Sequence, residues 1–531
     1  MVHCTTHNCL KLQYSEYAMR LASTIAPLAL LSEVVLASEP KVVSHSIRRH
    51  NRQPDRLARR SRKRDVAANS LFNNVPLTLY EVNITVGTPE QPITLDIDTG
   101  SSDIWMFSKD VYANCSGYCT GGSFDASKSS TYKLTGEDAF EIQYADSTGA
   151  SGDYFTDTVH LSNASATNVT LAVATSLDEW DLVSPGIMGI GFDSNEASEE
   201  EYAGFIDDLV QQGLINTRSY SLWLDDLQAS TGTILFGGYD TGKFDGNLTI
   251  LEIQEDPDYG VIDGFYVAFT SLTFTNSTKS IALTSEGLSE GLPALLDSGT
   301  SLTYVPTEMY TELANHFGAY TNDSNQQVLV PCDIGEGSLE YGFGGGSSPV
   351  VKVPFSELAE LAWDSSVTPP APIMLSSGKQ ACLFGLQPAD SDDEIVFGDT
   401  FLRSAYVVYD IDQKLIGLGQ SNFNSTSSHL VEIPTGDNPF GTIGVTVSSA
   451  SISATGGTSS MSTKPGHAAT ASADATSSGS GAAITGMTTS IAGATYTTGS
   501  ASATATGKSG AGPQYAGMGL AAVAGVAAFA L

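Results

Sequence analysis

The chain has 531 residues, enough for two or three domains, and a formal net charge of −35 at pH 7. Residues 1–64 carry twelve Lys/Arg and four Asp/Glu. The rest of the chain carries twelve Lys/Arg and fifty-five Asp/Glu, a formal net charge of −43 (12 − 55). Such an acidic body repels nucleic acid and anionic membrane surfaces, and its self-repulsion falls at low pH, where carboxylates are protonated. We therefore expect no nucleic-acid partner and a protein suited to an acidic medium; the alternative is that the acidity only aids solubility.

The N-terminus is typical of a secretory signal. Eighteen mostly polar residues precede Met19 and Arg20, and an apolar run over residues 21–31 leads to a small-residue cleavage pattern that ends at Ala37. We predict a signal peptide over residues 1–37, with Met19 as an alternative start of translation.

A basic segment follows over residues 38–64. It ends in the dibasic pair Lys63-Arg64, the kind of site that secretory processing proteases cut, so we predict a propeptide and a mature protein that starts at Asp65. Because this segment is cationic and the body is anionic, we expect it to hold onto an acidic cleft until it is removed. A nuclear-localisation or nucleic-acid-binding patch is the alternative, and the secretory signal argues against it.

Between about residues 77 and 424 the chain is dense in short β-type runs separated by Gly, Ser, Asp and Asn. Helical periodicity is best at residues 201–212 and 306–317. This pattern predicts an all-β fold, mostly antiparallel, with minor helices.

One short turn occurs twice, as Asp98-Thr99-Gly100-Ser101-Ser102 and as Asp297-Ser298-Gly299-Thr300-Ser301. Each copy lies between apolar runs, so each predicts a buried strand, a turn with an Asp at its tip and a return into the core. A second repeated pattern follows each turn, at residues 186–190 and 395–399. In both copies an apolar run meets a Gly. We therefore predict two lobes of similar plan, over residues 65–245 and 246–430, each supplying one Asp.

Two Asp side chains brought together can form an acid–base pair. Carboxylates a few ångström apart cannot both ionise cheaply, so they share one proton. The charged member can take a proton from water while the protonated member gives one to a carbonyl oxygen, and amide hydrolysis then needs neither a covalent intermediate nor a metal or other cofactor. The carboxylates of an inverting glycosidase are the chemical alternative, but they sit further apart.

Four cysteines remain once the signal is removed, and an even number in a secretory chain predicts disulfides. Three connectivities are open, of which the simplest pairs neighbours, Cys115–Cys119 and Cys332–Cys382. The spacing Cys-x3-Cys also invites a zinc site, but no further Cys/His pair completes one, so we expect no metal. Eight glycosylation sequons fit the same secretory route: Asn83, Asn114, Asn163, Asn168, Asn247, Asn276, Asn322 and Asn424.

The C-terminal part changes composition to Ser, Thr, Ala and Gly with almost no charge. Residues 431–510 are predicted to form an extended, O-glycosylated stalk, because the segment lacks the apolar content for a core. Residues 511–531 end in small apolar residues without a basic stop, which predicts a GPI-attachment signal whose acceptor lies within about 502–510. A tail-anchored helix is the alternative, and the apolar stretch is short for one.

The motifs together resemble the pepsin-like aspartic proteases over roughly residues 77–424. The resemblance rests on both Asp turns, on the sequence Asp-Ile-Trp at residues 103–105, and on Ile-Val-Phe-Gly-Asp-Thr-Phe at residues 395–401. It implies two β-barrel-like lobes with a cleft between them that binds a peptide in extended form, and Asp98 and Asp297 as the catalytic dyad. Ser101 and Thr300 would bond the outer carboxylate oxygens, and Thr99 and Ser298 would tie the two loops together. The full supporting set is Thr99, Gly100, Ser101, Ser298, Gly299 and Thr300.

The family also has a hairpin flap whose Tyr closes over the substrate. Tyr144 and Asp146 match that flap, and Trp105 is the expected hydrogen-bond partner of the tyrosine. Relatives usually carry Gly after this Tyr, where this chain has Ala145. The alternative is that Tyr144 is simply an aromatic residue of a strand.

The basic propeptide, the stalk and the GPI-like tail together resemble the fungal yapsin and candidapepsin branch. Yapsin-like members favour basic residues at the cleavage site, and the acidic run Glu199–Glu201 with Asp146 is compatible with that preference, although acidic runs are usually solvated faces. We predict a monomeric, secreted aspartic endopeptidase, made as a zymogen, active at acidic pH and GPI-anchored at the plasma membrane or cell wall. A catalytically idle peptide-binding or wall-structural protein on the same fold is the alternative, and the presence of both Asp residues argues against it.

Overall fold

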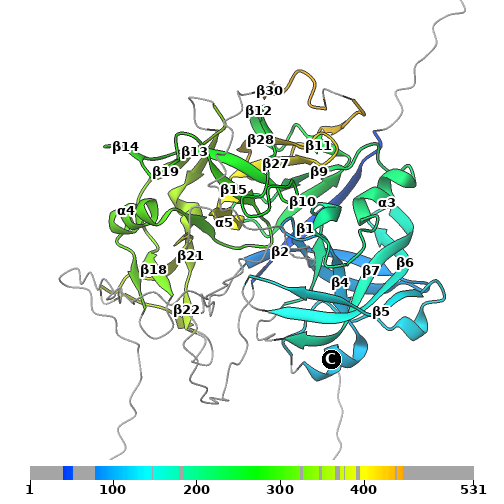
Figure 1. Cartoon of the computed structure of the whole chain (residues 1–531). Helices are drawn as coiled ribbons and strands as arrows, with labels where there is room; N and C mark the ends of the chain where they lie inside the picture. Colours follow the sequence, from blue (N-terminus) through cyan, green and yellow to red (C-terminus); the bar gives the residue numbers. More distant parts are fainter. Residues whose placement is uncertain are drawn as a thin grey trace, which may run out of the picture.

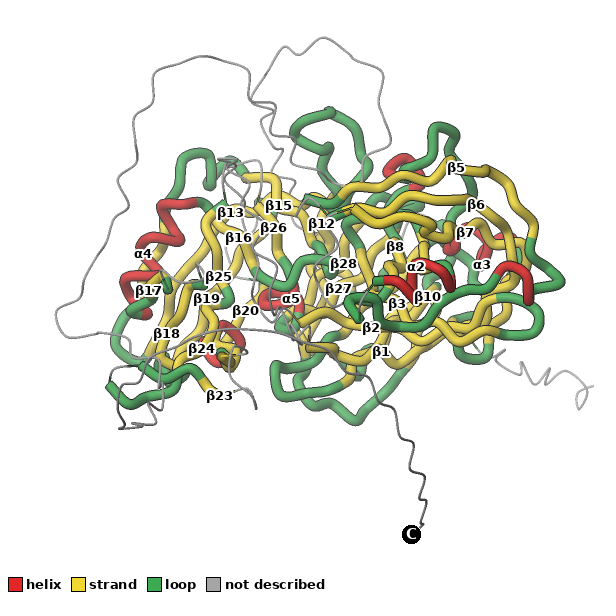
Figure 2. Tube along the Cα trace, turned by 90° about the horizontal axis from the view of Figure 1, so that it is seen from below, coloured by secondary structure: helices red, strands yellow, loops and turns green. Residues whose placement is uncertain are grey.

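The computed structural model describes residues 40–51, 78–115, 117–145, 148–178, 184–322, 327–345, 350–364, 371–375, 377–389, 395–436 and 439–446. Within these ranges the chain consists mostly of strands, with a few short helices. Figure 1 shows the N-terminal half, in blue to cyan, beside the C-terminal half, in green to yellow, and Figure 2 shows the same two lobes from below. The predicted all-β, bilobal plan with minor helices is confirmed.

One large sheet runs through both lobes. Its strands, in spatial order, are β30 (Gly444–Thr446), β12 (Phe244–Glu252), β28 (Leu415–Ser421), β27 (Ala405–Asp410), β9 (Ser219–Trp223), β10 (Thr231–Phe236), β1 (Val43–Asn51), β2 (Thr78–Val86), β3 (Gln91–Asp98), β8 (Gly186–Gly189), β4 (Ile104–Phe107), β7 (Ala164–Asp178), β6 (Gly149–Leu161) and β5 (Lys133–Gln143). β2 also pairs with β6, which closes the strands from β2 to β6 into a barrel-like ring. Because β27 and β28 come from late in the chain, the sheet joins the two lobes through backbone hydrogen bonds.

The C-terminal lobe has a second large sheet. Its order is β20 (Val351–Pro354), β19 (Gly337–Phe343), β13 (Tyr266–Asn276), β15 (Leu292–Leu296), β26 (Ile395–Phe397), β16 (Thr303–Val305) and β25 (Leu386–Pro388), with β14 (Ser280–Leu283) beside β13. A smaller sheet contains β17 (Tyr320–Thr321), β18 (Val328–Pro331), β24 (Ala381–Phe384) and β21 (Ala359–Leu361). Two further pairs are β11 (Gly238–Asp240) with β29 (Leu430–Glu432), and β22 (Trp363–Asp364) with β23 (Ala371–Pro372).

The helices are short. They are α2 (Lys109–Asn114), α3 (Phe205–Gln211), α4 (Thr307–Phe317) and α5 (Asp399–Leu402), with 3-10 turns η1 (Ala126–Lys128), η2 (Asp193–Asn195) and η3 (Phe355–Leu358). α4 agrees with the predicted range, and it ends where Gly318 takes a left-handed φ of +66°. α3 starts later than predicted because Gly204 is its N-cap. No helix in the described part of the chain is both long and apolar enough to cross a membrane.

The internal repeat is built into the strand pairing. In the first lobe β3 runs parallel to β8, and β8 antiparallel to β4; in the second, β15 runs parallel to β26, and β26 antiparallel to β16. Glycines end β8 and follow β26, where the backbone passes close to another chain segment. A Cβ on Gly189 would lie 2.7 Å from Asp103 N, and one on Gly398 would collide with Thr300 O. Each lobe therefore presents its Asp turn on the same local scaffold.

The folded part extends beyond the expected limits at both ends. β1 lies within the predicted basic propeptide, where Val43 and Ile47 are buried in the core because they alternate with polar residues along the strand. At the other end, Ile433 and Phe440 are buried against the large sheet although residues from 431 on were expected to form a stalk. The structure thus packs residues up to Thr446, and the rest of the predicted stalk and the tail lie outside the described residues.

Two arginines are paired with carboxylates. Arg403 is completely buried, and its Nε lies 2.7 Å from Glu357 Oε2. Arg218 lies between three carboxylates, 2.7 Å from one oxygen of Asp412 and 3.4 Å from oxygens of Asp193 and Asp207. Buried cations need such partners, because an unpaired charge in the interior is costly.

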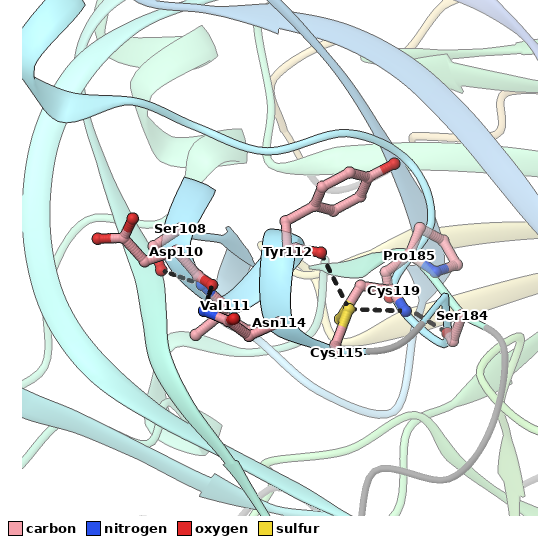
Figure 3. The surroundings of a disulfide bond; sticks show 9 residues. All are labelled: Ser108, Asp110, Val111, Tyr112, Asn114, Cys115, Cys119, Ser184 and Pro185. Carbon is pink, nitrogen blue, oxygen red and sulfur yellow. Dashed lines mark hydrogen bonds between the residues drawn. A yellow bond between two sulfur atoms is a disulfide. The ribbon is translucent and has the colours of Figure 1, made fainter. Parts of the chain in front are cut away.

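Both predicted disulfides form. Cys332 and Cys382 join β18 to β24 with their Cα atoms 4.8 Å apart, and Cys115 and Cys119 close a short loop after α2. Figure 3 shows this loop next to Ser184, with α2 capped by the Ser108 hydroxyl, which accepts from Val111 N. None of the eight predicted glycosylation asparagines is buried, and six of them are exposed. Lys63 and Arg64 lie outside the described residues.

Candidate active site

The two Asp turns meet where the lobes join. β3 ends at Asp98, and Asp297 directly follows β15. Each turn's glycine faces the carboxylate of the opposite turn: a Cβ on Gly100 would lie 2.7 Å from Asp297 Oδ1, and one on Gly299 would collide with Asp98 Oδ1. Only glycine leaves room for the carboxylates to approach each other in this way.

Each carboxylate is held by its own turn in the same manner. The amide of Gly100 donates to Asp98 Oδ1 at 2.8 Å, and the Ser101 hydroxyl donates to Asp98 Oδ2. In the second turn the amide of Gly299 donates to Asp297 Oδ1 at 2.8 Å. The Thr300 hydroxyl donates to Asp297 Oδ2 at 2.5 Å. The predicted bonds from Ser101 and Thr300 are therefore present, and they orient the two carboxylates symmetrically.

Two buried hydroxyls tie the turns to each other. Thr99 Oγ1 donates to Leu296 O at 2.9 Å and accepts from Ser298 N at 3.0 Å. Ser298 Oγ donates to Ile97 O at 2.9 Å and accepts from Thr99 N at 3.3 Å. Each side chain thus bonds the backbone of the opposite lobe, as expected for these two residues, and the pair fixes the spacing of the turns.

The electrostatics favour one shared proton. Burial raises the pKa of Asp98 well above its usual range, and the neighbouring Asp297 carboxylate raises it further. The bonds from Ser101 and Gly100 oppose this shift because they stabilise the charged form. A carboxyl that keeps its proton at mildly acidic pH can serve as an acid beside a second carboxylate that serves as a base.

Comparison with known proteins agrees with this geometry. Residues 79–421 match the family model of the eukaryotic aspartyl proteases. The chain belongs to that family. It is 40% identical to a probable aspartic-type endopeptidase, OpsB, of Aspergillus oryzae over 75% of this chain and 80% of the relative. It is 35% identical to an acid protease of Saccharomycopsis fibuligera, over 65% and 82% of the two chains, and 34% identical to secreted aspartic protease 8 of Candida albicans, over 69% and 82%. The protein is therefore an aspartic endopeptidase, an enzyme that hydrolyses peptide bonds.

The residues predicted to form a flap lie at the hairpin of β5 and β6. Tyr144 and Ala145 follow β5, and Trp105 Nε1 donates to the Tyr144 hydroxyl at 2.7 Å, as expected. Trp105 is fully buried on β4, so it ties the Tyr144 side chain to the strand that leaves the first Asp turn. Asp146 lies outside the described residues.

A buried polar cluster behind the first Asp turn was not predicted. Asp103 Oδ1 accepts from the hydroxyls of Tyr154 at 2.7 Å and Tyr202 at 2.9 Å, and Asp103 Oδ2 accepts from Ala197 N at 2.7 Å. Glu196 lies beside this cluster, and burial raises its pKa to about 9. The signal that the sequence offered was a carboxylate inside the turn motif itself, Ser-Ser-Asp at residues 101–103.

The cluster supports the first Asp turn. Asn195 Nδ2 donates to Gly100 O at 3.1 Å, so the segment that carries Glu196 bonds directly to the turn that carries Asp98. Tyr202 N donates to Glu196 Oε2 at 2.9 Å, which closes the segment on itself. A change in this segment can therefore reach the turn that carries Asp98 through a single backbone carbonyl.

Proposed function

We propose that the protein is a secreted, cell-surface aspartic endopeptidase whose catalytic dyad is Asp98 and Asp297. The observation that carries the proposal is the matched pair of turns, in which each carboxylate accepts one amide and one hydroxyl bond and faces the glycine of the other lobe. No other pair of carboxylates in the described part of the chain has this symmetry at the junction of the lobes.

In the proposed cycle Asp98 begins protonated, since burial and Asp297 raise its pKa. The Asp297 carboxylate takes a proton from water while the water oxygen attacks the peptide carbonyl carbon, and Asp98 gives its proton to the carbonyl oxygen. The tetrahedral diol then collapses: Asp297 protonates the leaving nitrogen, the C–N bond breaks, and Asp98 recovers its proton from a diol hydroxyl. Both products leave and the dyad returns to its starting protonation.

The test is the activity of Asp98→Asn and Asp297→Asn in the full chain. Each should abolish peptide hydrolysis while the melting temperature stays close to that of the wild type. Asp256→Asn is the matched control, because Asp256 also caps two amides of a turn, those of Asp258 and Tyr259, but lies outside the two Asp motifs. Full activity in either dyad variant would exclude the assignment.

The pH profile is a second test. The raised pKa of Asp98 means that the shared proton is retained at acidic pH and lost as the pH rises. Once both carboxylates are ionised no acid remains to protonate the carbonyl oxygen, so activity should fall toward neutral and alkaline pH. A profile that stays flat into alkaline pH would contradict the mechanism.

We further propose that residues 38–64 are a propeptide removed after Lys63-Arg64. The position of β1 supports this proposal. Before removal the segment is held in the large sheet, because β1 pairs with β10 and β2. Arg49 contributes a bond to Leu227 O and an ion pair with Glu360 at 2.7 Å. N-terminal sequencing of the secreted protein should give Asp65, and substitution of both basic residues by Ala should leave the segment attached.

The cell-surface location rests on composition. The Ser/Thr-rich segment and the small apolar tail support a stalk followed by GPI attachment. A phosphatidylinositol-specific phospholipase should release the enzyme from membranes of cells that express the full chain. Release that is equally complete without the phospholipase would argue for a freely secreted enzyme instead.

A further inference from the structure

The hairpin of β5 and β6 is attached to the rest of its lobe along one side. β5 is the outermost strand of the large sheet (Figure 2), and it pairs with β6 and with no other described strand. Most of its side chains are exposed, and Phe140 and Ile142 are its two buried residues. β6 continues the sheet by pairing with β7. The position of the hairpin therefore depends on β6 and on the few side chains that pack against the lobe.

Irregular pairing separates the distal end of the hairpin, residues 140–145 and 148–151, from its body. The register of β5 on β6 shifts just before Phe140, and the register of β6 on β7 shifts just before Gly152. A Cβ on Gly152 would collide with the backbone of β7, so glycine permits this close approach. Register shifts interrupt the ladder of hydrogen bonds and bend the strand. The backbone ladder thus holds the distal end less firmly than the body.

Two side-chain hydrogen bonds connect the hairpin to the chain that leaves the first Asp turn. Trp105 Nε1 donates to the Tyr144 hydroxyl in the distal end at 2.7 Å. The Tyr154 hydroxyl, on β6 just after the register shift, donates to Asp103 Oδ1 at 2.7 Å. Asp103 and Trp105 are two residues apart, a spacing that places side chains on the same side of an extended chain. The hairpin is therefore held at two points, one on each side of the shift in β6.

A small apolar core fixes the side chains that make these bonds. Strand pairing puts Tyr154 opposite Ala172 of β7, and Ala172 beside Trp105 of β4. All three belong to one buried cluster with Phe140, in which the small alanine leaves room for the aromatic rings. The centroid of the Phe140 ring lies 6.1 Å from that of Trp105 and 5.5 Å from that of Tyr154. Because the rings are packed together, the Tyr154 hydroxyl is held in place in front of Asp103.

Asp103 is an acceptor shared between the hairpin and a second segment. It is completely buried, and its Oδ1 accepts from the hydroxyls of both Tyr154 and Tyr202. Its Oδ2 accepts from the amide of Ala197. Tyr154 belongs to the hairpin, whereas Tyr202 and Ala197 belong to the segment whose Asn195 side chain bonds the backbone of the first Asp turn. One side chain therefore connects the hairpin, this segment and the first Asp turn.

We propose that Asp103 is a positioning residue for peptide hydrolysis, which fixes the β5–β6 hairpin relative to the turn that carries Asp98. Its side chain is completely buried, so it acts through Tyr154 and not on the substrate. This inference rests on the proposed function, because it gives the hairpin its expected place over a substrate bound beside Asp98.

The loss of this bond should change the position of the hairpin and leave the chemistry of the dyad intact. Without the Tyr154 hydroxyl, the distal end leaves its position more often, because a buried hydrogen bond shifts such an equilibrium by roughly tenfold. A substrate must then bind to the fraction of enzyme whose hairpin is in place, and its apparent affinity falls with that fraction. KM should therefore change more than kcat.

Hydrogen exchange tests the position of the hairpin without any substrate. The experiment compares Tyr154→Phe with the wild-type tyrosine in the full chain, in an Asp98→Asn background that prevents self-digestion. Exchange at residues 149–152 and 174–178, where the distal end pairs with β7, should be roughly tenfold faster in the variant. Exchange at residues 164–171, in the body of β7, should not change.

Kinetics of the active chain test the consequence for the reaction. Tyr154→Phe should raise KM for a peptide substrate at least about threefold and keep kcat within about twofold. Asp103→Asn keeps the size of the side chain but leaves the amide of Ala197 without its acceptor, and it should act in the same direction. Melting temperatures show whether each variant is folded, and Tyr154→Phe carries the test if Asp103→Asn does not fold.

Tyr406→Phe is the matched control. The Tyr406 hydroxyl is also buried and bonded, since it donates to Ser221 Oγ at 2.9 Å, but it lies on β27, in the part of the large sheet that joins the C-terminal lobe. The control should lose stability and keep both the exchange of the hairpin and KM.

The outcomes are distinguishable. If Tyr154→Phe keeps wild-type exchange at residues 149–152, Asp103 does not position the hairpin. If exchange rises but KM and kcat stay at their wild-type values, the position of the hairpin does not affect the reaction, and the inference is refuted. It is also refuted if Tyr406→Phe raises KM as much as Tyr154→Phe, because the effect is then one of general stability. If the wild type cuts no peptide of a mixed library, the proposed function itself fails, and this result comes before any variant is measured.

Discussion

Thr99→Val removes one hydroxyl from the junction of the lobes and keeps the size and branching of the side chain. The hydroxyl donates to Leu296 O and accepts from Ser298 N, so the variant leaves two buried backbone groups without these bonds. Each buried polar group left unsatisfied costs about 1–3 kcal/mol, so the free energy of unfolding should fall by about 2–6 kcal/mol. The same loss loosens the spacing of the two Asp turns, and a misplacement of about 1 Å can cost roughly 100-fold in rate.

Stability and activity can be measured separately. Urea unfolding, followed by tryptophan fluorescence, is done in an Asp98→Asn background so that the protein does not digest itself, and kcat/KM is measured in the active chain. Thr303→Val is the matched control, because the Thr303 hydroxyl is also fully buried and lies 2.7 Å from Thr400 Oγ1, within the C-terminal lobe alone. The control should lose stability and keep its kcat/KM.

Two results would refute this reasoning. Thr99→Val could keep both its urea midpoint and its kcat/KM, which would mean that the two bonds contribute nothing. It could instead lose stability as Thr303→Val does but keep full kcat/KM, which would mean that the hydroxyl does not set the dyad spacing. Ser298→Ala extends the test: both hydroxyls hold the same junction, so the double variant should lose less stability than the sum of the two single losses.

Three further predictions concern the surroundings of the site. Burial raises the pKa of Glu196 from 4.5 to about 9, so the folded state keeps a proton that the unfolded state releases, and stability should fall as the pH rises through that range. Glu196→Gln cannot ionise, and its melting temperature should fall less over the same range; an unchanged slope would contradict the assignment. Tyr144→Phe removes the acceptor of the Trp105 indole and should lower kcat/KM several-fold with little change in melting temperature, whereas wild-type kinetics would show that this bond does not position the flap. Replacing Cys332 and Cys382 by Ser opens a crosslink between residues 50 apart and should cost about 4 kcal/mol in urea unfolding; a loss below about 1 kcal/mol would show that the unfolded chain is not constrained by it.

The Asp turns could be predicted from sequence because their bonds are local. The groups that hold Asp98 come from Gly100 and Ser101, two and three residues later, and the same spacing recurs after Asp297. Backbone geometry over so few residues follows from the residue types, since glycine permits the turn and a hydroxyl reaches the carboxylate. The adjoining strands followed from their apolar runs for the same reason.

Contacts between distant segments could not be predicted in this way. Asp103 accepts hydrogen bonds from Tyr154 and Tyr202, which lie 51 and 99 positions later in the chain. No local sequence pattern predicts partners at such separations. The position of residues 43–51 as a strand of the large sheet was also not predicted, although Val43 and Ile47 are spaced as the buried residues of a strand would be. Their high local charge suggested an electrostatic contact, whereas the segment fills a position between two strands that only the complete sheet reveals.

The pairing of Arg403 and Arg218 with carboxylates has a consequence for proteolysis of the chain. Arg403 is sealed in the core, and Arg218 is surrounded by three aspartates. Beyond residue 64 the chain has only ten other Lys/Arg residues (12 − 2), while the first 64 residues hold twelve. A protease that cuts next to basic side chains would find few of them in the rest of the chain and many in the N-terminal segment. Cleavage at basic residues would thus remove the N-terminal segment and leave the folded lobes intact.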